Sequence, residues 1–267
     1  MRFLKISLSV LFVLAVCFLI VKGCVRKRAV YPRSQTVQIQ RRLVPAPVTK
    51  PKMAIILDDW GNNFSLVENA IEIARPLTLS VLPHLPQSRR VAEEAYTHGL
   101  GVMLHMPMEP KNSKEPLEPH TIMTTTPDAE IVRTLDQALA SVPHVEGMNN
   151  HMGSLATSDE RVMRTVLRSL KERGLFFVDS FVISSTVAPL ICKEEGIRST
   201  KRDIFIDNEL KLGSVKSKLK DAAQMALKRG KVVVIGHDKK ITLEAIKEMV
   251  PEIEKAGVQF VLVKEIM

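Results

Sequence analysis

Short apolar runs alternate with longer helical segments through residues 53–267, and this alternation constrains the fold more than any other feature of the sequence. Met53 to Leu57 is typical of the apolar runs, because five consecutive apolar residues have the length of a buried strand. Gln87 to His98, followed by Gly99, is typical of the helical segments. Strands that alternate with helices in this way predict parallel pairing through crossover helices.

Seven or eight such strand and helix units are present, which favours a closed or nearly closed (β/α) barrel over an open sheet. No glycine-rich phosphate fingerprint follows the first strand, so a dinucleotide-binding fold is not favoured. The expected strands are 53–57, 77–82, 101–104, 145–148, 175–178, 204–206, 232–235 and 258–263. The expected helices are 64–74, 87–98, 129–141, 158–174, 184–195, 214–228 and 242–256. No linker interrupts residues 53–267, which we therefore predict to be one domain.

The formal net charge of +9 is confined to the N-terminal part of the chain. Residues 1–57 carry eleven of the 38 basic residues and no acidic residue, so the remainder holds 27 basic and 29 acidic side chains. A nearly neutral domain lacks the basic surface that binds phosphate backbones, so we expect no nucleic-acid partner. The basic flank suits an anionic membrane surface.

Residues 1–28 have the pattern of a targeting segment, since basic residues precede and follow an apolar run from Ile6 to Val21. We expect a signal or membrane anchor there that exports the protein to the cell envelope, on the periplasmic or extracytoplasmic side. A cleaved or lipid-modified signal is the alternative. Residues 29–52 are rich in proline, glutamine and arginine and are expected to form a tether.

Polar residues follow several of the predicted strands. In a (β/α) barrel the carboxyl ends of the strands share one face, and that face holds the active site. The polar residues expected in this mouth are His84, His105, His151 and His237, with Asp58, Asp59, Asp179 and Asp207. His98 and His144 precede strands and are expected at the opposite face, whereas His120 lies in a long polar loop.

Asp58 and Asp59 cannot both point the same way from a regular strand, because successive side chains alternate. In a turn just past the strand they can diverge, so that one binds a cation while the other reaches a water. A carboxylate with two imidazoles is a common ligand set for Zn²⁺ or a similar divalent ion. Together with His105, His151 and His237, the acid pair predicts metal-assisted hydrolysis with a general base and a general acid.

The motifs that carry these residues resemble the successive motifs of the divergent polysaccharide deacetylase family. They are Leu57-Asp58-Asp59-Trp60-Gly61, His105-Met106-Pro107-Met108-Glu109-Pro110, Gly147-Met148-Asn149-Asn150-His151-Met152-Gly153-Ser154, Asp179-Ser180 and Ile235-Gly236-His237. The family is related to the nodulation-type polysaccharide deacetylases, which act on N-acetylated sugars with a bound metal. The resemblance covers residues 53–267 and implies a distorted (β/α)₇-type barrel with parallel strands and an outer ring of helices.

The resemblance also implies roles for individual residues. Asp58 matches the general base of the family and Asp59 matches a metal ligand. His105 and His151 resemble the remaining ligands of one divalent ion, which we expect to be zinc. His237 matches the histidine that protonates the departing amine.

Further residues are expected around this centre. Asp179 resembles a carboxylate that orients the catalytic histidine. Asn149, Asn150 and Ser180 can hydrogen-bond sugar hydroxyls, although each can equally cap local backbone. Trp60 can stack on a sugar ring or can close the mouth of the barrel.

The sequence departs from the better-known deacetylases in two motifs. The stretch that corresponds to their His-x-x-x-His pair is His105-x-x-x-Glu109, broken by prolines. Their Arg-x-Pro motif is replaced by Asn149-Asn150-His151, so we expect His151 to supply the missing ligand.

The expected function is a metal-dependent, deacetylase-like hydrolase that acts on an N- or O-acetylated envelope saccharide. A catalytically inactive envelope protein that binds a glycan, a metal or a partner is an alternative, as is a metal hydrolase for another ester or amide bond. The sequence indicates no particular oligomeric state.

Overall fold

The computed structural model describes residues 50–267, so the expected anchor and residues 29–49 of the expected tether lie outside it. Its strands form one sheet in the order β6-β5-β4-β3-β2-β1-β8-β7, with β9 added beside β1, and every pairing is parallel. The strands are β1 (Lys52–Trp60), β2 (Thr78–Val81), β3 (Gly101–Met108), β4 (Gly147–Met152), β5 (Phe176–Asp179), β6 (Ser199–Lys201), β7 (Ile204–Phe205), β8 (Lys231–His237) and β9 (Gln259–Phe260).

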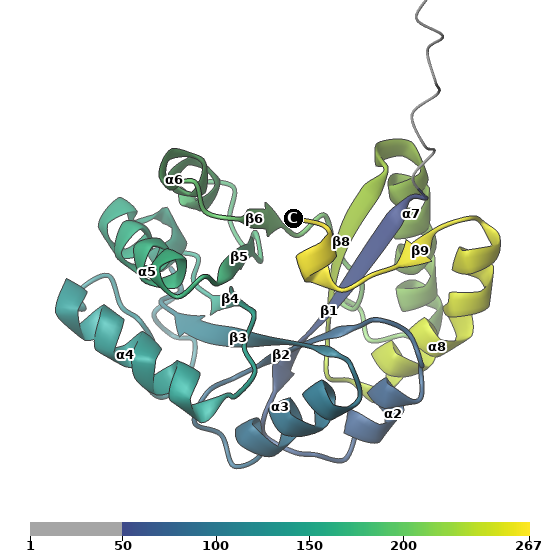
Figure 1. The fold of residues 1–267 in the computed structure, drawn as a ribbon, viewed down its shortest axis with the longest axis horizontal. Coiled ribbons are helices and arrows are strands. Elements are labelled where there is room, and N and C mark those ends of the chain that lie inside the picture. Colours follow the sequence, from purple (N-terminus) through teal and green to yellow (C-terminus); the bar gives the residue numbers. More distant parts are fainter. Residues whose placement is uncertain (1–49) are drawn as a thin grey trace, which may run out of the picture. The chain divides into compact units, whose positions relative to one another are not determined.

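The helices surround the outside of the curved sheet (Figure 1). They are α2 (Val67–Ile71), α3 (Ser88–Thr97), α4 (Asp128–Ser141), α5 (Glu160–Glu172), α6 (Ala188–Glu195), α7 (Leu212–Arg229) and α8 (Lys240–Lys255), with 3₁₀ turns η1 (Ala156–Ser158) and η2 (Val263–Glu265). This arrangement confirms the expected distorted barrel of parallel strands with an outer ring of helices. Within residues 50–267, no helix has both the length and the apolar composition that crossing a membrane requires.

The ring of strands is open beside β6 (Figure 1), because β6 and β7 are the two end strands of the sheet. These two strands are neighbours in the sequence but lie at opposite ends of the sheet, and no pairing joins them. Arg202 spans this seam from the short segment between them. Its guanidinium donates to the carbonyl oxygens of Ser180 and Phe181 at 2.7 and 2.8 Å, and stacks 3.8 Å from the ring centre of Phe205.

Strand alternation divides the side chains of the sheet into an inner and an outer set. The inner set forms a small apolar cluster that includes Ala54 and Ile56 of β1 and Val233 and Ile235 of β8. The outer set packs against the helices in a much larger core. A residue two positions beyond Ile56 or Ile235 therefore points into the barrel, and these residues are Asp58 and His237.

The C-terminal segment fills the end of the barrel where the strands begin. β9 pairs with the first residues of β1, Lys52 and Met53, at the end opposite the strand C-termini. Val261, Val263 and Ile266 then join the inner apolar cluster. Because this end is packed with the side chains of the chain itself, only the other end offers a mouth.

Several local elements differ from the sequence-based expectation. The strand expected at 101–104 continues from His105 to Met108 as part of β3, despite Pro107. Beyond Leu104, β3 pairs with β4 on one side and, through a single bridge at Met108, with Ile122 on the other. The carbonyl oxygen of Pro107 accepts a hydrogen bond from Ile122 N at 2.9 Å, a contact that needs no N–H from the proline. Strand β6 was missed because its sequence, Ser-Thr-Lys, carries no apolar signal.

Candidate active site

Asp58 and Asp59 lie within β1 rather than in a turn beyond it, which corrects the expected placement. The pairing of β1 with β2 shifts register between Leu57 and Trp60, as at a β-bulge. Asp59 takes a left-handed backbone conformation with φ of 68°, which costs an L-residue roughly 1–2 kcal/mol and which aspartate tolerates better than most residues. Asp58 follows the alternation of β1 into the barrel, and the irregularity after it turns Asp59 toward the same mouth.

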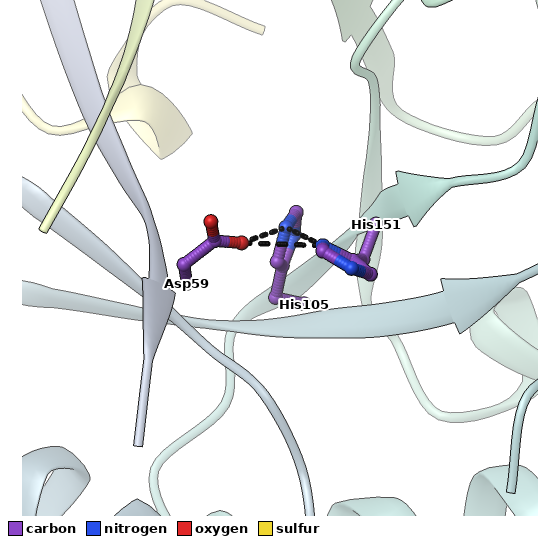
Figure 2. Close-up of side chains that lie close together, drawn as sticks. All are labelled: Asp59, His105 and His151. Atoms are coloured by element: carbon purple, nitrogen blue, oxygen red, sulfur yellow. Dashed lines mark hydrogen bonds and ion pairs between the residues drawn. The ribbon is translucent and has the colours of Figure 1, made fainter. Parts of the chain in front are cut away.

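Asp59 meets two histidines at the barrel mouth (Figure 2). Its Oδ1 atom lies 3.3 Å from His105 Nε2 and 3.2 Å from His151 Nδ1. The two histidine nitrogens are 3.1 Å apart. His105 lies in β3 and His151 in β4, and both side chains are on the inner face of the sheet. The two strands pair with each other. The structure thus brings together the three residues that the sequence analysis assigned to a metal.

The donor set fits a divalent cation. Asp59 Oδ1 is buried and meets no well-formed hydrogen-bond donor among residues 50–267, although both ring nitrogens lie within 3.3 Å of it. Ligand atoms around a tetrahedral Zn²⁺ at 2.0–2.1 Å are about 3.3 Å apart, close to the three separations observed. Burial acts to raise the pKa of Asp59, but His105 and His151 outweigh it and hold that pKa well below its usual range. An anionic Asp59 is the form that binds a cation.

Asp58 lies beside this cluster and is almost completely buried. Asn149 Nδ2 donates to both of its oxygens, at 2.9 and 3.2 Å, and His105 Nε2 is 3.8 Å from its Oδ2. Burial raises the pKa of Asp58 and outweighs the opposing effects of His105, Asn149 and His237. A carboxylate with a raised pKa is a stronger proton acceptor than an exposed one.

His237 pairs with Asp58 in register across β8 and β1. Its Nδ1 lies 2.9 Å from Asp207 Oδ1, and its backbone N–H donates to Asp207 Oδ2 at 2.7 Å. Thr242 Oγ1 also donates to Asp207 Oδ2, at 2.8 Å. Burial acts to lower the pKa of His237, but the hydrogen bond and charge of Asp207 outweigh it, so the pKa is raised. The side chain of His237 remains 30% exposed and can reach a ligand.

The orienting carboxylate of His237 is therefore Asp207, and the expectation that Asp179 has this role is wrong. On β5, Phe176 and Val178 point into the barrel, so Asp179 points outward with Phe177. Asp179 accepts hydrogen bonds from Phe181 N and Thr186 Oγ1 and lines a cavity of about 280 Å³ beside α6. It stabilises the loop after β5.

The structure does not offer the four expected substrate-binding side chains to a ligand. Asn149 and Asn150 are buried in β4, and Asn150 bonds Met152 O and Ser180 N. Ser180 is buried and donates to Asn150 O. Trp60 is only 1% exposed and belongs to the core between sheet and helices, so it cannot stack on a sugar in the mouth. Asn150 and Ser180 bond local backbone, which is the alternative stated for them above, and burial keeps Asn149 and Trp60 away from a ligand.

A cavity of about 220 Å³ opens beside Asp59 and His151. Its other lining residues are Asn62, Asn63, Leu82, Glu118, Asp238 and Lys239, which come from the loops after β1, β3 and β8 and from the end of β2. These residues carry no sequence motif and were therefore not predicted. His84, expected in the mouth, instead packs against His120 with ring centres 4.8 Å apart and does not join the cluster.

Two proteins of similar sequence are described as uncharacterized. The chain is 32% identical over 205 residues to the uncharacterized protein YibQ of Escherichia coli, covering 77% of this chain and 64% of that protein. It is 34% identical over 198 residues to an uncharacterized protein of Haemophilus influenzae, covering 73% of this chain and 70% of that protein. The chain therefore spans less than two thirds of the length of the E. coli relative.

Solved structures share the fold. An uncharacterized protein of Agrobacterium tumefaciens superposes with a TM-score of 0.78 at 21% identity, over 83% of this chain and 91% of that one. A family 4 carbohydrate esterase of Streptomyces lividans, solved with acetate, superposes with a TM-score of 0.52 at 13% identity, over 80% and 93% of the two chains. Residues 55–267 match the family described as divergent polysaccharide deacetylase, which confirms the resemblance carried by the motifs. This chain belongs to the divergent polysaccharide deacetylase family.

Proposed function

We propose that this protein is a metal-dependent hydrolase that removes an acetyl group from an N- or O-acetylated saccharide of the cell envelope. The observation that carries the proposal is the convergence of Asp59, His105 and His151 within 3.3 Å of one another, beside Asp58 and His237. The family match and the acetate-bound esterase of the same fold support the reaction class. The basic, apolar N-terminal segment supports anchoring to the envelope.

Asp59, His105 and His151 would hold a divalent ion, most simply zinc. When bound, such an ion polarises the acyl carbonyl and lowers the pKa of a water molecule. Asp58 then accepts the proton of the attacking water, since burial has raised its pKa and Asn149 fixes its orientation. His237, whose pKa is raised by Asp207, donates a proton to the departing amine or hydroxyl group.

The cavity beside Asp59 supports a saccharide as the substrate. Asn62, Glu118 and Lys239 supply polar groups of both hydrogen-bonding kinds around it, as recognition of sugar hydroxyls requires. The cavity is adjacent to the cluster itself, so a ligand held there lies next to the proposed metal ligands.

Metal analysis of the purified protein tests the assignment of the ligands. We expect about one equivalent of zinc in the wild type, because the site offers three converging ligand atoms. His151→Ala should lose the metal, whereas His98→Ala should retain it, because His98 lies at the exposed end of α3. Equal metal content in the two variants would contradict the site.

Acetate release from N-acetylated oligosaccharides tests the reaction. Asp58→Asn keeps the shape of the side chain but cannot accept a proton, so kcat should fall by roughly 10²- to 10⁴-fold. Unchanged activity in this variant would remove Asp58 as the general base. A wild-type protein that binds zinc and releases no acetate from N- or O-acetylated saccharides would favour the non-catalytic alternative.

A further inference from the structure

Asn149 lies on the inner face of β4, completely buried between the two halves of the active site. Its side-chain oxygen accepts hydrogen bonds from Ser80 Oγ at 2.5 Å and from His105 Nδ1 at 2.8 Å. Its side-chain nitrogen donates to the two oxygens of Asp58 at 2.9 and 3.2 Å. One carboxamide therefore contacts both the proposed base and a proposed metal ligand.

These contacts allow the amide of Asn149 only one orientation. If its oxygen and nitrogen were exchanged, the oxygen would face the Asp58 carboxylate, and two acceptors would meet without a hydrogen between them. Because the Asn149 oxygen carries no hydrogen, the contact with His105 requires a proton on Nδ1. A neutral His105 then keeps its lone pair on Nε2, the nitrogen that faces Asp59 and His151.

We propose that Asn149 is a positioning residue with two separable effects. Its oxygen fixes His105 in the tautomer that can bind an ion through Nε2, and its nitrogen anchors the Asp58 carboxylate beside that ligand. The second effect rests on the proposed function, whereas the first concerns ion binding alone. Ser80 supports both effects, because its hydroxyl occupies the remaining acceptor site of the Asn149 oxygen.

Two substitutions in the full-length protein separate these effects, with zinc affinity measured by competition with a chelator. Asn149→Leu removes both hydrogen-bonding atoms and should weaken zinc binding by about 10- to 100-fold. Asn149→Asp keeps an oxygen acceptor for His105, so zinc affinity should stay within about threefold of the wild type. Acetate release should nevertheless fall by about 100-fold in Asn149→Asp, because a second carboxyl group repels Asp58 or shares a proton with it.

A matched control lies on the opposite face of the same strand. Asn150→Asp makes the same chemical change in a buried asparagine that bonds Met152 and Ser180 instead. Its zinc affinity should equal that of the wild type. A second measurement requires no variant: nitrogen NMR of the zinc-loaded wild type should show His105 protonated at Nδ1 and unprotonated at Nε2.

Wild-type zinc affinity in Asn149→Leu, or a His105 proton on Nε2, would overturn the tautomer effect. Equal loss of zinc in Asn149→Leu and Asn149→Asp would overturn the division between oxygen and nitrogen. If the wild type releases no acetate, the proposed function fails, while the zinc affinities and the His105 signals still decide whether Asn149 sets the tautomer.

Discussion

At the scale of single residues, the carboxylate that pairs with His237 is decided by which strands lie side by side, and not by the sequence motifs. Asp207 lies at the end of β7, beside β8, and meets both the ring and the backbone of His237. Asp179 follows a strand in the same way, but its position in the alternation turns it out of the barrel. The sequence placed both aspartates after strands, and only the structure distinguishes their directions.

Asp207→Asn should change the pH dependence of the reaction. The charge of Asp207 is a principal cause of the raised pKa of His237, so its removal lowers that pKa. His237 acts as an acid when protonated, and activity falls as pH rises through its pKa. The basic limb of kcat/KM against pH should therefore move to lower pH, and kcat at neutral pH should fall by roughly 10²-fold.

Asp179→Asn is the matched control, because Asp179 bonds Phe181 and Thr186 and does not contact His237. The basic limb should remain where it is in the wild type. A shift in the Asp179 variant with none in the Asp207 variant would reverse the assignment.

At the scale of elements, the loop between β3 and α4 forms part of the wall of the cavity beside Asp59. Hydrogen bonds to Glu109 hold the two ends of this loop together. Its Oε2 accepts from Thr124 N and Oγ1, its backbone N–H donates to Ile122 O, and its carbonyl oxygen accepts from Leu155 N. Between these ends, the loop places Glu118 in the lining of that cavity. The loop therefore places a carboxylate at the cavity beside the proposed metal ligands without being one of them.

Glu118→Gln should weaken saccharide binding and leave the chemistry intact. Loss of one charged hydrogen bond to a sugar hydroxyl costs about 1.5 kcal/mol, so KM should rise by about tenfold with kcat unchanged. Initial-rate kinetics with an N-acetylated oligosaccharide measures both. Glu115→Gln, in the same loop but bonded to Asn112, should behave like the wild type, and a matching rise in its KM would contradict the role of Glu118.

Much of this arrangement follows from sequence alone, and the failures have physical causes. Strand and helix periodicity predicted the barrel, and His105 and His151 lie in the expected mouth because each occupies the C-terminal half of a parallel strand. Asn149 and Asn150 were treated alike, although adjacent strand residues face opposite sides. Asp207 was expected in the mouth, but its contact with His237 depends on the pairing of β7 with β8. Glu118 carries no local signal, because its position depends on the path of a loop.

At the scale of the whole molecule, the C-terminal segment closes one end of the barrel. Ile266→Ala should lower the free energy of unfolding by about 2–4 kcal/mol, because it removes a nearly buried side chain from the inner cluster. Urea denaturation measures this loss. Zinc content should not change, since the metal ligands lie at the other end.

Leu190→Ala is the comparison for that measurement, because Leu190 is an apolar side chain that is 60% exposed on α6. Its free energy of unfolding should stay within about 0.5 kcal/mol of the wild type. Equal losses in the two variants would show that the C-terminal segment does not support the barrel.

The open seam also makes the protein divisible. Within residues 50–267, no strand pairing joins β6 to β7, so a cut in the chain between Lys201 and Ile204 removes no ladder hydrogen bond. Such a cut would leave the metal ligands and the base on one fragment, and the acid His237 with Asp207 on the other. We expect the two fragments to complement each other when mixed, because pairing between β1 and β8 would bring Asp58 and His237 together again.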